Sequence, residues 1–122
     1  MTAVAVALGG ALGAAARFTL ERAVTTRLGH GFPWGTALVN VTGSLAAGVV
    51  VGLATEHGLG ESVESVVAAG FLGGYTTLST HAVETVRLVE NRRAVRAGAY
   101  ALGSAALAVG AAALGLAVSG GI

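Results

Sequence analysis

The segment between Trp34 and Ala54 carries no charged side chain, and three other stretches of the chain are nearly as apolar. A helix rises about 1.5 Å per residue, so a segment of this length spans roughly 30 Å, the thickness of the hydrocarbon core of a membrane. Only 11% of the 122 residues are charged, against about 25% in soluble domains. We therefore expect an all-α membrane protein with a single domain over residues 1–122. Its four predicted transmembrane helices cover residues 3–20, 34–54, 63–89 and 95–118.

The third of these helices contains a segment that does not suit a continuous helix in lipid. Gly73 and Gly74 are adjacent, and hydroxyl side chains follow them up to Thr80. We predict a break at residues 73–79. Lipid cannot satisfy the backbone groups that a break releases, so the break must be buried in protein or line a polar cavity. Broken helices at this depth commonly present carbonyl oxygens and helix ends to ions, and the segment therefore predicts an ion site.

Three helices contain glycines spaced four residues apart, which lets helix backbones approach closely in a membrane. The pairs are Gly9 and Gly13, Gly48 and Gly52, and Gly70 and Gly74. Packing within one chain accounts for any single pair. Four helices of this size can hardly enclose a pore alone, however, so we expect self-association or pairing with a related chain.

The basic residues, all of them arginines, are distributed unevenly. With four spans, the first and third connections fall on the same side of the membrane, and the arginines gather there: Arg22 and Arg27 at the first, and Arg92, Arg93 and Arg96 at the third. The second connection holds Glu56, His57 and Glu61 but no arginine. By the positive-inside rule, we predict a multi-pass protein of the inner (plasma) membrane with both termini outside.

Motifs in all four helices occur in the order that one family of small membrane proteins shows. They are Gly9-Gly-Ala-Leu-Gly-Ala-Ala-Ala-Arg17, Gly35-Thr-Ala-Leu-Val-Asn40 with Gly43, Gly70-Phe-Leu-Gly-Gly-Tyr-Thr-Thr77, then Glu84, Tyr100 and Ser104. On these residues the sequence resembles the small fluoride channels of the Fluc or CrcB family. The resemblance covers nearly the whole chain, and the full series is specific although each motif alone is weak.

The resemblance implies an antiparallel dimer with two pores, through which cytoplasmic fluoride leaves the cell passively and its toxicity is reduced. It also implies a structural sodium ion (Na+) at the dimer centre, which is not transported and is held by backbone carbonyls of Gly73 and Thr76. A hard cation prefers oxygen ligands, and a helix break frees carbonyl oxygens. The implied partners are fluoride, membrane lipid and a second subunit, with no nucleic acid.

The fluoride path implied by the resemblance combines side chains of three helices. Its residues are Asn40, Leu78, Ser79, Thr80, His81, Tyr100 and Ser104. Fluoride gives up strongly held water in a pore, so N–H and O–H donors must replace that water. Other roles stay open. Asn40 would also suit a packing hydrogen bond between helices. Tyr100 and Ser104 could instead make contacts between helices, and the Thr77 side chain could bond to the backbone of its own helix.

Two charged residues are expected near the ends of this path. Arg17 resembles the family's first-helix arginine, which either draws the anion into a vestibule or extends its charged group to the membrane interface. Glu84 lies within a helix, where a carboxylate is costly unless it is paired or hydrated. The family suggests a role for Glu84 at the pore mouth, and pairing with Arg87 is the alternative.

The chain departs from the family at two positions. Where the family typically reads Thr-Thr-Phe-Ser-Thr-Phe, this chain has Leu78 and His81 in place of the phenylalanines. Phenylalanine ring edges are positive and suit an anion, whereas leucine has no such edge. Histidine keeps a ring and an N–H, but its protonated form could bind the anion too tightly for fast passage, and a core role is also open. Together with the one-sided arginines, these changes favour a heterodimer with a homologous subunit of opposite topology.

Other functions fit the sequence less well. A small multidrug exporter needs a carboxylate within the first helix, which has none before Glu21. A cation channel needs rings of acidic or carbonyl groups along its path. A non-conducting or partly conducting partner subunit is the closest alternative, because of Leu78 and His81. An enzyme is not expected, since no nucleophile–base pair or metal-ligand cluster stands out.

Overall fold

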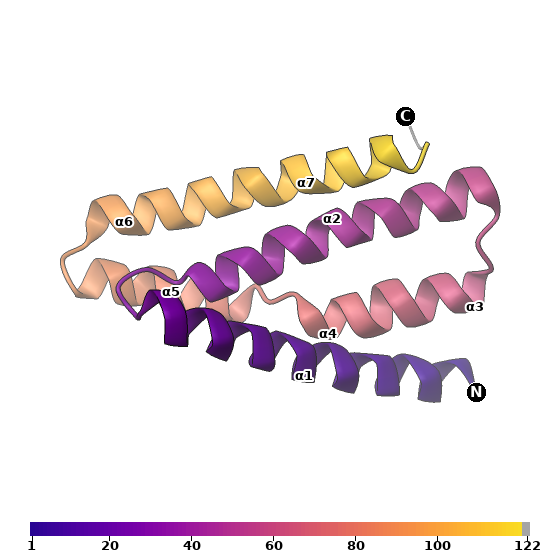
Figure 1. The fold of residues 1–122 in the computed structure, drawn as a ribbon, viewed down its shortest axis with the longest axis horizontal. Coiled ribbons are helices and arrows are strands. Elements are labelled where there is room, and N and C mark those ends of the chain that lie inside the picture. Colours follow the sequence, from indigo (N-terminus) through magenta and orange to yellow (C-terminus); the bar gives the residue numbers. More distant parts are fainter. Residues whose placement is uncertain (121–122) are drawn as a thin grey trace.

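The computed structural model describes residues 1–120, which form an all-helical chain. Helix α1 spans Thr2–Leu28, and α2 spans Trp34–His57. The third pass joins α3 (Glu61–Glu64), the π-helix η1 (Ser65–Leu72), α4 (Gly73–Tyr75) and α5 (Ser79–Glu90). The last pass joins α6 (Ala94–Gly98), the π-helix η2 (Ala99–Gly103) and α7 (Ser104–Val118). The passes alternate in direction, so the N-terminus and the end of α7 lie at the same end of the molecule (Figure 1).

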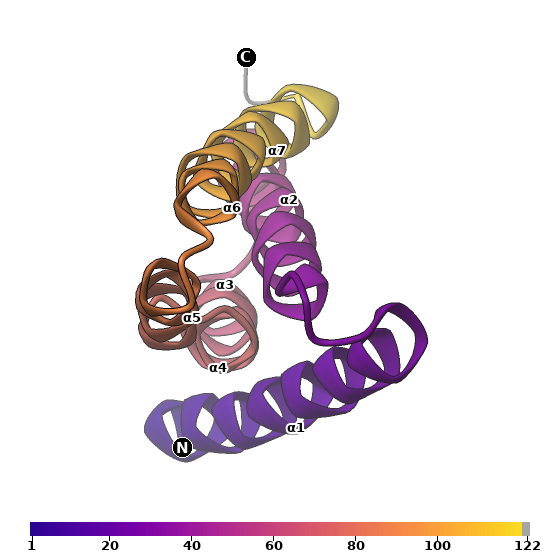
Figure 2. The same ribbon diagram turned by 90° about the vertical axis from the view of Figure 1, so that its left-hand side faces the viewer.

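The arrangement of the passes places the third one beside both α1 and α2. Helix α2 packs along α7, and α1 packs along η1 and α4. Seen along the long axis, α2 lies between α1 and α7, with α4 and α5 to one side (Figure 2). The break in the third pass therefore faces α2, and the polar side chains of α2 can reach it.

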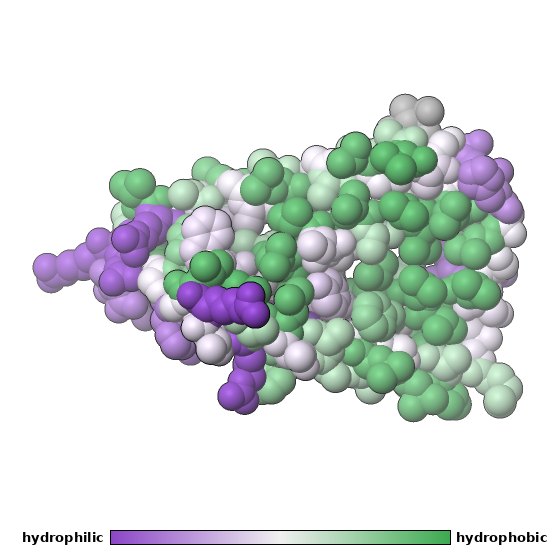
Figure 3. All heavy atoms as spheres, in the orientation of Figure 1, coloured by the Kyte–Doolittle hydropathy of each residue, from purple (hydrophilic) through white to green (hydrophobic). Residues whose placement is uncertain are grey.

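Three of the described helices are long and apolar enough to cross a membrane: Thr2–Leu28, Trp34–His57 and Ala94–Val118. The third pass is not among them, because its break leaves two halves that are each shorter than the roughly 18 residues a span needs. Large apolar side chains such as Leu107 and Val109 are exposed, which would be unfavourable in water. Hydrophobic residues cover the visible flank of the molecule, while the most hydrophilic residues gather at the end that carries the α1–α2 and α5–α6 connections (Figure 3). The chain is a membrane protein.

Helix α1 is longer than the sequence predicted, since it continues beyond Leu20 to Leu28. Glutamate and arginine are good helix formers, so the charged stretch after the apolar part extends the helix. Gly29 ends it with a φ of 81°, a conformation that favours glycine, and its N–H donates to the oxygen of Thr25 at 2.8 Å. The second and fourth passes agree with their predicted bounds to within a few residues.

The break in the third pass is shorter than predicted and lies at residues 76–78 rather than 73–79. The two adjacent glycines are helical in α4, and the chain becomes extended only at Thr76, with φ −81° and ψ 156°. A Cβ atom on Gly74 would overlap the backbone oxygen of Gly10 in α1. Gly74 therefore allows α4 to pack closely against α1, and the unwinding comes from the residues that follow the two glycines.

The other glycine pairs also pack helices within the chain. A Cβ atom on Gly9 or Gly13 would meet the backbone of η1, and one on Gly48 would overlap the backbone oxygen of Ala112 in α7. Such close approaches are what small residues provide in membrane helices. Packing inside one chain thus accounts for these pairs, and the expected self-association rests on other features.

Candidate functional site

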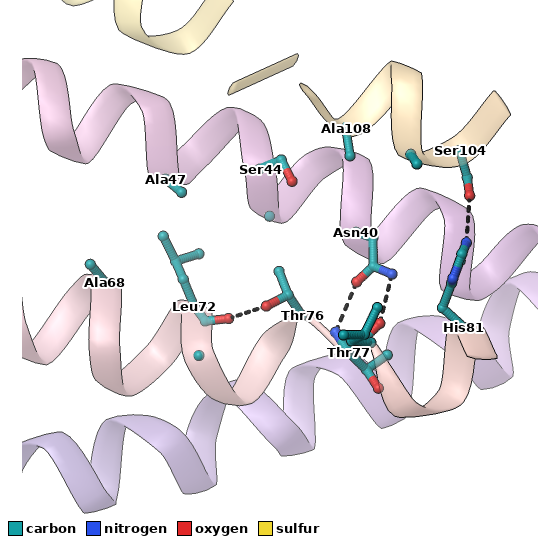
Figure 4. A pocket seen from close by; sticks show the side chains of 14 residues that line it. Asn40, Ser44, Ala47, Ala68, Leu72, Thr76, Thr77, His81, Ser104 and Ala108 are labelled. Atoms are coloured by element: carbon teal, nitrogen blue, oxygen red, sulfur yellow. Dashed lines mark hydrogen bonds between the residues drawn. The ribbon is translucent and has the colours of Figure 1, made fainter. Parts of the chain in front are cut away.

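The unwound segment is tied to α2 by one side chain. Asn40 Nδ2 donates to the backbone oxygen of Thr77 at 2.8 Å, and the Thr77 N–H donates to Asn40 Oδ1, also at 2.8 Å (Figure 4). In a continuous helix the Thr77 N–H would bond to the oxygen of Gly73, four residues earlier. The Asn40 amide replaces the helical partners of Thr77, which explains why the helix can open at this position.

Hydroxyl groups form hydrogen bonds with the backbone on both sides of the break. At the end of α4, Thr76 Oγ1 donates to the oxygen of Leu72 at 2.9 Å. At the start of α5, Thr77 Oγ1 accepts from the Thr80 N–H at 3.1 Å, and Ser79 Oγ lies 3.4 Å from Thr77 Oγ1. Thr77 therefore bonds to the backbone of the helix that follows it, which is the alternative role that the sequence left open for this side chain.

The break leaves four backbone oxygens, those of residues 73–76, without the N–H groups that a continuous helix would direct to them. The N–H groups of Thr77 and Thr80, which a continuous helix would direct to Gly73 and Thr76, bond to side chains instead. Within residues 1–120, the oxygens of Gly73 and Thr76 accept no backbone hydrogen bond. Among the four, Gly73 and Thr76 are those that the family resemblance implied as sodium ligands, and carbonyl oxygens suit a hard cation. The described residues contain no cluster of three His, Asp or Glu side chains that could hold a metal ion.

A cavity of about 490 Å³ lies beside the break, between α2, the third pass and the start of α7. Its wall brings together six of the residues that the sequence singled out: Asn40, Gly73, Thr76, Leu78, His81 and Ser104. Asn40 and Ser44 project from α2, and His81 and Ser104 face one another across the far side (Figure 4). Ser79 and Thr80 stand next to the cavity at the start of α5 without lining it.

His81 and Ser104 are joined by a hydrogen bond whose direction the surrounding groups determine. His81 Nε2 lies 3.0 Å from Ser104 Oγ. The Ser104 hydroxyl donates its single hydrogen to the backbone oxygen of Tyr100, so Ser104 Oγ can only accept from the imidazole. The neutral ring therefore carries its proton on Nε2 and leaves a lone pair on Nδ1. The N–H that His81 could offer to an anion is already used by Ser104.

Tyr100 lies behind His81 and does not line the cavity. Its side chain is fully buried, with its ring 4.6 Å from that of His81 and in edge contact with Phe32 at 5.5 Å. In the described part of the chain its hydroxyl has no hydrogen-bond partner. Of the predicted path residues, Tyr100 is the one that the structure places in the core.

A second cavity, of about 280 Å³, lies at the end of the molecule where the arginines gather, and Glu84 contributes to its lining. Glu84 Oε1 accepts a hydrogen bond from the Thr36 hydroxyl at 2.8 Å, and Thr36 is only 3% exposed. No ion pair joins Glu84 to Arg87 in residues 1–120. Sequence reasoning did not select Thr36, although it lies inside the motif from Gly35 to Asn40, where a hydroxyl among apolar residues was the available signal.

Arg17 binds backbone next to the break rather than lining either cavity. Its Nε donates to the oxygen of Gly74 at 3.3 Å, and its Nη1 lies 3.9 Å from Glu21 Oε2. The other Glu21 oxygen is buried and has no hydrogen-bond partner in the described residues. The vestibule role of Arg17 stays a prediction, and Glu21, which was not selected from the sequence, is the acidic group that accompanies it.

A small helical membrane protein that holds an interrupted helix beside a cavity with several polar side chains has the architecture typical of proteins that handle ions within the bilayer. Comparison with known proteins gives the family. The family described as "CrcB-like protein, Camphor Resistance (CrcB)" matches residues 4–116. The chain belongs to this family, which confirms the resemblance seen in the sequence.

Named relatives extend over nearly the same length. The fluoride-specific ion channel FluC 1 of Leifsonia xyli subsp. xyli is 43% identical over 120 residues, which cover 98% of this chain and 88% of the relative. The fluoride-specific ion channel FluC of Novosphingobium aromaticivorans is 42% identical over 125 residues, covering 100% and 99%. That of Thermus thermophilus is 40% identical over 117 residues, covering 96% and 94%. These relatives are named as channels, which confirms the prediction that the chain is not an enzyme.

Proposed function

We propose that the chain is a subunit of a fluoride-specific ion channel that lets cytoplasmic fluoride leave the cell passively and so reduces fluoride toxicity. The observation that carries this proposal is the 40–43% identity to proteins named as fluoride-specific channels, which extends over nearly the whole chain. The motif residues of the family also converge in this fold, at the break and around the first cavity.

The proposed fluoride path joins the two cavities. It begins at the arginine-bearing end, passes the Glu84–Thr36 pair and the His81–Ser104 pair, and reaches the first cavity beside Asn40. An asparagine amide has two N–H bonds, and Thr77 takes one of those of Asn40. The second N–H is the donor that we assign to fluoride in the cavity.

The break supports assembly with a second subunit. Leu78 is 80% exposed, and Gly73 and Ser79 are exposed as well, so the opened backbone lies at the surface of the single chain. Unpaired backbone groups facing lipid are costly, and only protein or water can cover them. We propose an antiparallel dimer, formed with a second copy or with a homologous subunit of opposite topology, with a structural sodium ion at its centre on the Gly73 and Thr76 oxygens. When bound, sodium would neutralise the negative ends of these carbonyls.

The proposed location is the inner (plasma) membrane, with both termini outside. The arginines of the first and third connections share one end of the molecule, where hydrophilic residues gather in Figure 3. The positive-inside rule assigns this end to the cytoplasm. Fluoride would therefore enter on the side of the second cavity.

A second candidate is a non-conducting or partly conducting subunit of a heterodimeric fluoride channel. It is favoured by Leu78, which offers no ring edge, and by the His81 N–H, which is used within the protein. The assembled channel would then depend on the pore of its partner.

Efflux from liposomes tests both candidates. The chain is purified and reconstituted alone into liposomes that are loaded with fluoride or chloride. Efflux of each ion is followed with an ion-selective electrode. The proposal predicts fluoride efflux without chloride efflux and its loss in Asn40→Asp, whose carboxylate would repel the anion. Full-rate flux by the chain alone would exclude the need for a partner subunit. Efflux of chloride as fast as fluoride would contradict the proposed selectivity.

A further inference from the structure

Two arginine side chains converge on one backbone oxygen at the end of the molecule where the arginines gather. Arg93 Nη1 donates to the oxygen of Gly31 at 3.2 Å, and Arg96 Nη1 donates to the same oxygen at 3.3 Å. Gly31 belongs to the connection between α1 and α2, whereas both arginines follow α5. The two guanidinium groups are therefore close neighbours above a loop from another part of the chain.

The turn after α5 holds Arg93 in this position. The Arg93 N–H donates to the oxygen of Leu88 at 2.8 Å, and the Arg92 N–H donates to that of Val89 at 3.0 Å, the pair of bonds that defines a Schellman motif. Arg92 takes the left-handed conformation of this motif, with a φ of 58°, where glycine is usual. These bonds fix the backbone of the turn and therefore the position from which the Arg93 side chain reaches Gly31.

Within residues 1–120, neither guanidinium group has a carboxylate partner. Arg17 and Glu21 form the one ion pair found within residues 1–120. Arg93 and Arg96 share only a neutral carbonyl, so two like charges are held together without compensation. An anion bound between them would attract both groups and offset their repulsion. The planar guanidinium group matches the oxygens of a phosphate group in particular.

The second cavity adjoins this pair and has the mixed lining that a lipid headgroup requires. Arg87, Arg93 and Asn91 supply N–H donors, and Phe32 and Leu88 supply apolar surface. Glu84 lies in the same lining, so a bound anion is expected beside Arg93 and not beside this carboxylate. The Phe32 ring lies 4.5 Å from that of Trp34, and tryptophan is a residue typical of the level of the headgroups.

We propose that Arg93 and Arg96, fixed over Gly31 at the arginine-bearing end, bind a phosphate group, and that an anionic membrane lipid supplies it. Basic pockets between transmembrane helices on the cytoplasmic side commonly hold such headgroups. The site would link the α1–α2 connection to the α5–α6 turn through the lipid phosphate as well as through Gly31. This inference does not depend on fluoride conduction.

The test measures lipid binding by the complete chain in detergent. Phosphatidylglycerol, phosphatidylcholine and inorganic phosphate are added separately, while native mass spectrometry counts bound lipid and the thermal midpoint is recorded. We expect phosphatidylglycerol to bind and to raise the midpoint more than phosphatidylcholine does. Arg93→Gln and Arg96→Gln should each weaken binding about tenfold, the equivalent of one charge-assisted hydrogen bond. The matched control is Arg92→Gln, which removes the same charge from the same turn and should leave binding unchanged.

Three results would overturn the proposal. Binding that is absent, or that falls equally in Arg92→Gln, would show that no defined site exists. A rise in midpoint with inorganic phosphate as large as that with phosphatidylglycerol would overturn the assignment to lipid. The midpoints of all variants without lipid, compared with that of the unaltered chain, show whether each variant is folded before its binding is judged.

Discussion

Asn40 and Thr77 form a reciprocal pair, in which the amide of one side chain bonds to both the N–H and the oxygen of one backbone residue, each at 2.8 Å. The two residues belong to different passes, so the pair fixes where the third helix opens and how the opened segment sits against α2. This single side chain couples the fold to the proposed fluoride path, because it also lines the cavity.

Asn40→Ala should therefore lower both stability and fluoride flux. Removing the amide leaves two half-buried backbone groups of Thr77 without partners, at a cost of about 1–3 kcal/mol for each group. The thermal midpoint in detergent and fluoride efflux from liposomes measure the two effects. Ser44→Ala is the matched control, since Ser44 lines the same cavity and no hydrogen bond to its side chain is found in the described residues. A normal midpoint for Asn40→Ala would contradict the structural part of this account.

Gly74→Ala should destabilise the chain, because the added Cβ would overlap the backbone oxygen of Gly10. Overpacking of this kind costs about 1–3 kcal/mol. Gly110→Ala is the control, since a Cβ there meets nothing within 4 Å, and alanine in a helix is favoured over glycine by up to about 1 kcal/mol. Thermal unfolding in detergent measures both effects. The midpoint of Gly74→Ala should be lower than that of the unaltered chain, and the midpoint of Gly110→Ala should be equal or higher. Equal midpoints would show that α1 and α4 do not pack as described.

Thr36→Val should destabilise the chain and slow fluoride flux, because it removes the hydroxyl that donates to Glu84 at 2.8 Å while keeping the side-chain shape. A hydrogen bond to a charged group contributes about 1.5–3 kcal/mol. Thr36→Ser retains the hydroxyl and should behave nearly like the unaltered chain. The readouts are the thermal midpoint and the initial rate of fluoride efflux. If valine and serine give the same result, the Thr36–Glu84 bond has no role in the path.

His81→Phe should raise fluoride flux, since a phenylalanine presents a positive ring edge where neutral His81 presents no free N–H. We expect a rise in the efflux rate of up to about tenfold, since about 1.4 kcal/mol removed from a barrier changes a rate by that factor. Ser104 loses a hydrogen bond in this variant, so the thermal midpoint is measured alongside efflux. His57→Phe, far from the cavity at the end of α2, serves as the control. Lower flux in His81→Phe with an unchanged midpoint would show that the histidine itself aids the anion.

The spans and the existence of a break could be predicted from the sequence, because uncharged stretches and clustered glycines and hydroxyls are local signals. The position of the break could not. It depends on Asn40, which lies 37 positions before Thr77 in the chain, and no local pattern reveals that contact. The adjacent glycines led us to predict that the break starts too early in the chain, because Gly74 is helical and packs against Gly10.

Only part of the site could be predicted, again because contacts between separate helices leave no local signal in the sequence. Family motifs located Asn40, His81 and Ser104, which the fold brings to one cavity. The same motifs could not show that Tyr100 is buried behind His81 or that Thr36 holds Glu84, because both depend on how side chains from separate helices meet. Three-dimensional packing decides which member of a motif faces the cavity.

The central claim is that this fold conducts fluoride selectively, and current recorded across a planar bilayer tests it most directly. The assembled protein is inserted into the bilayer. Fluoride and chloride gradients run in opposite directions across it, and sodium is present on both sides. The account predicts a current that reverses at the equilibrium potential of fluoride. A current that reverses at the equilibrium potential of chloride or of sodium would contradict it.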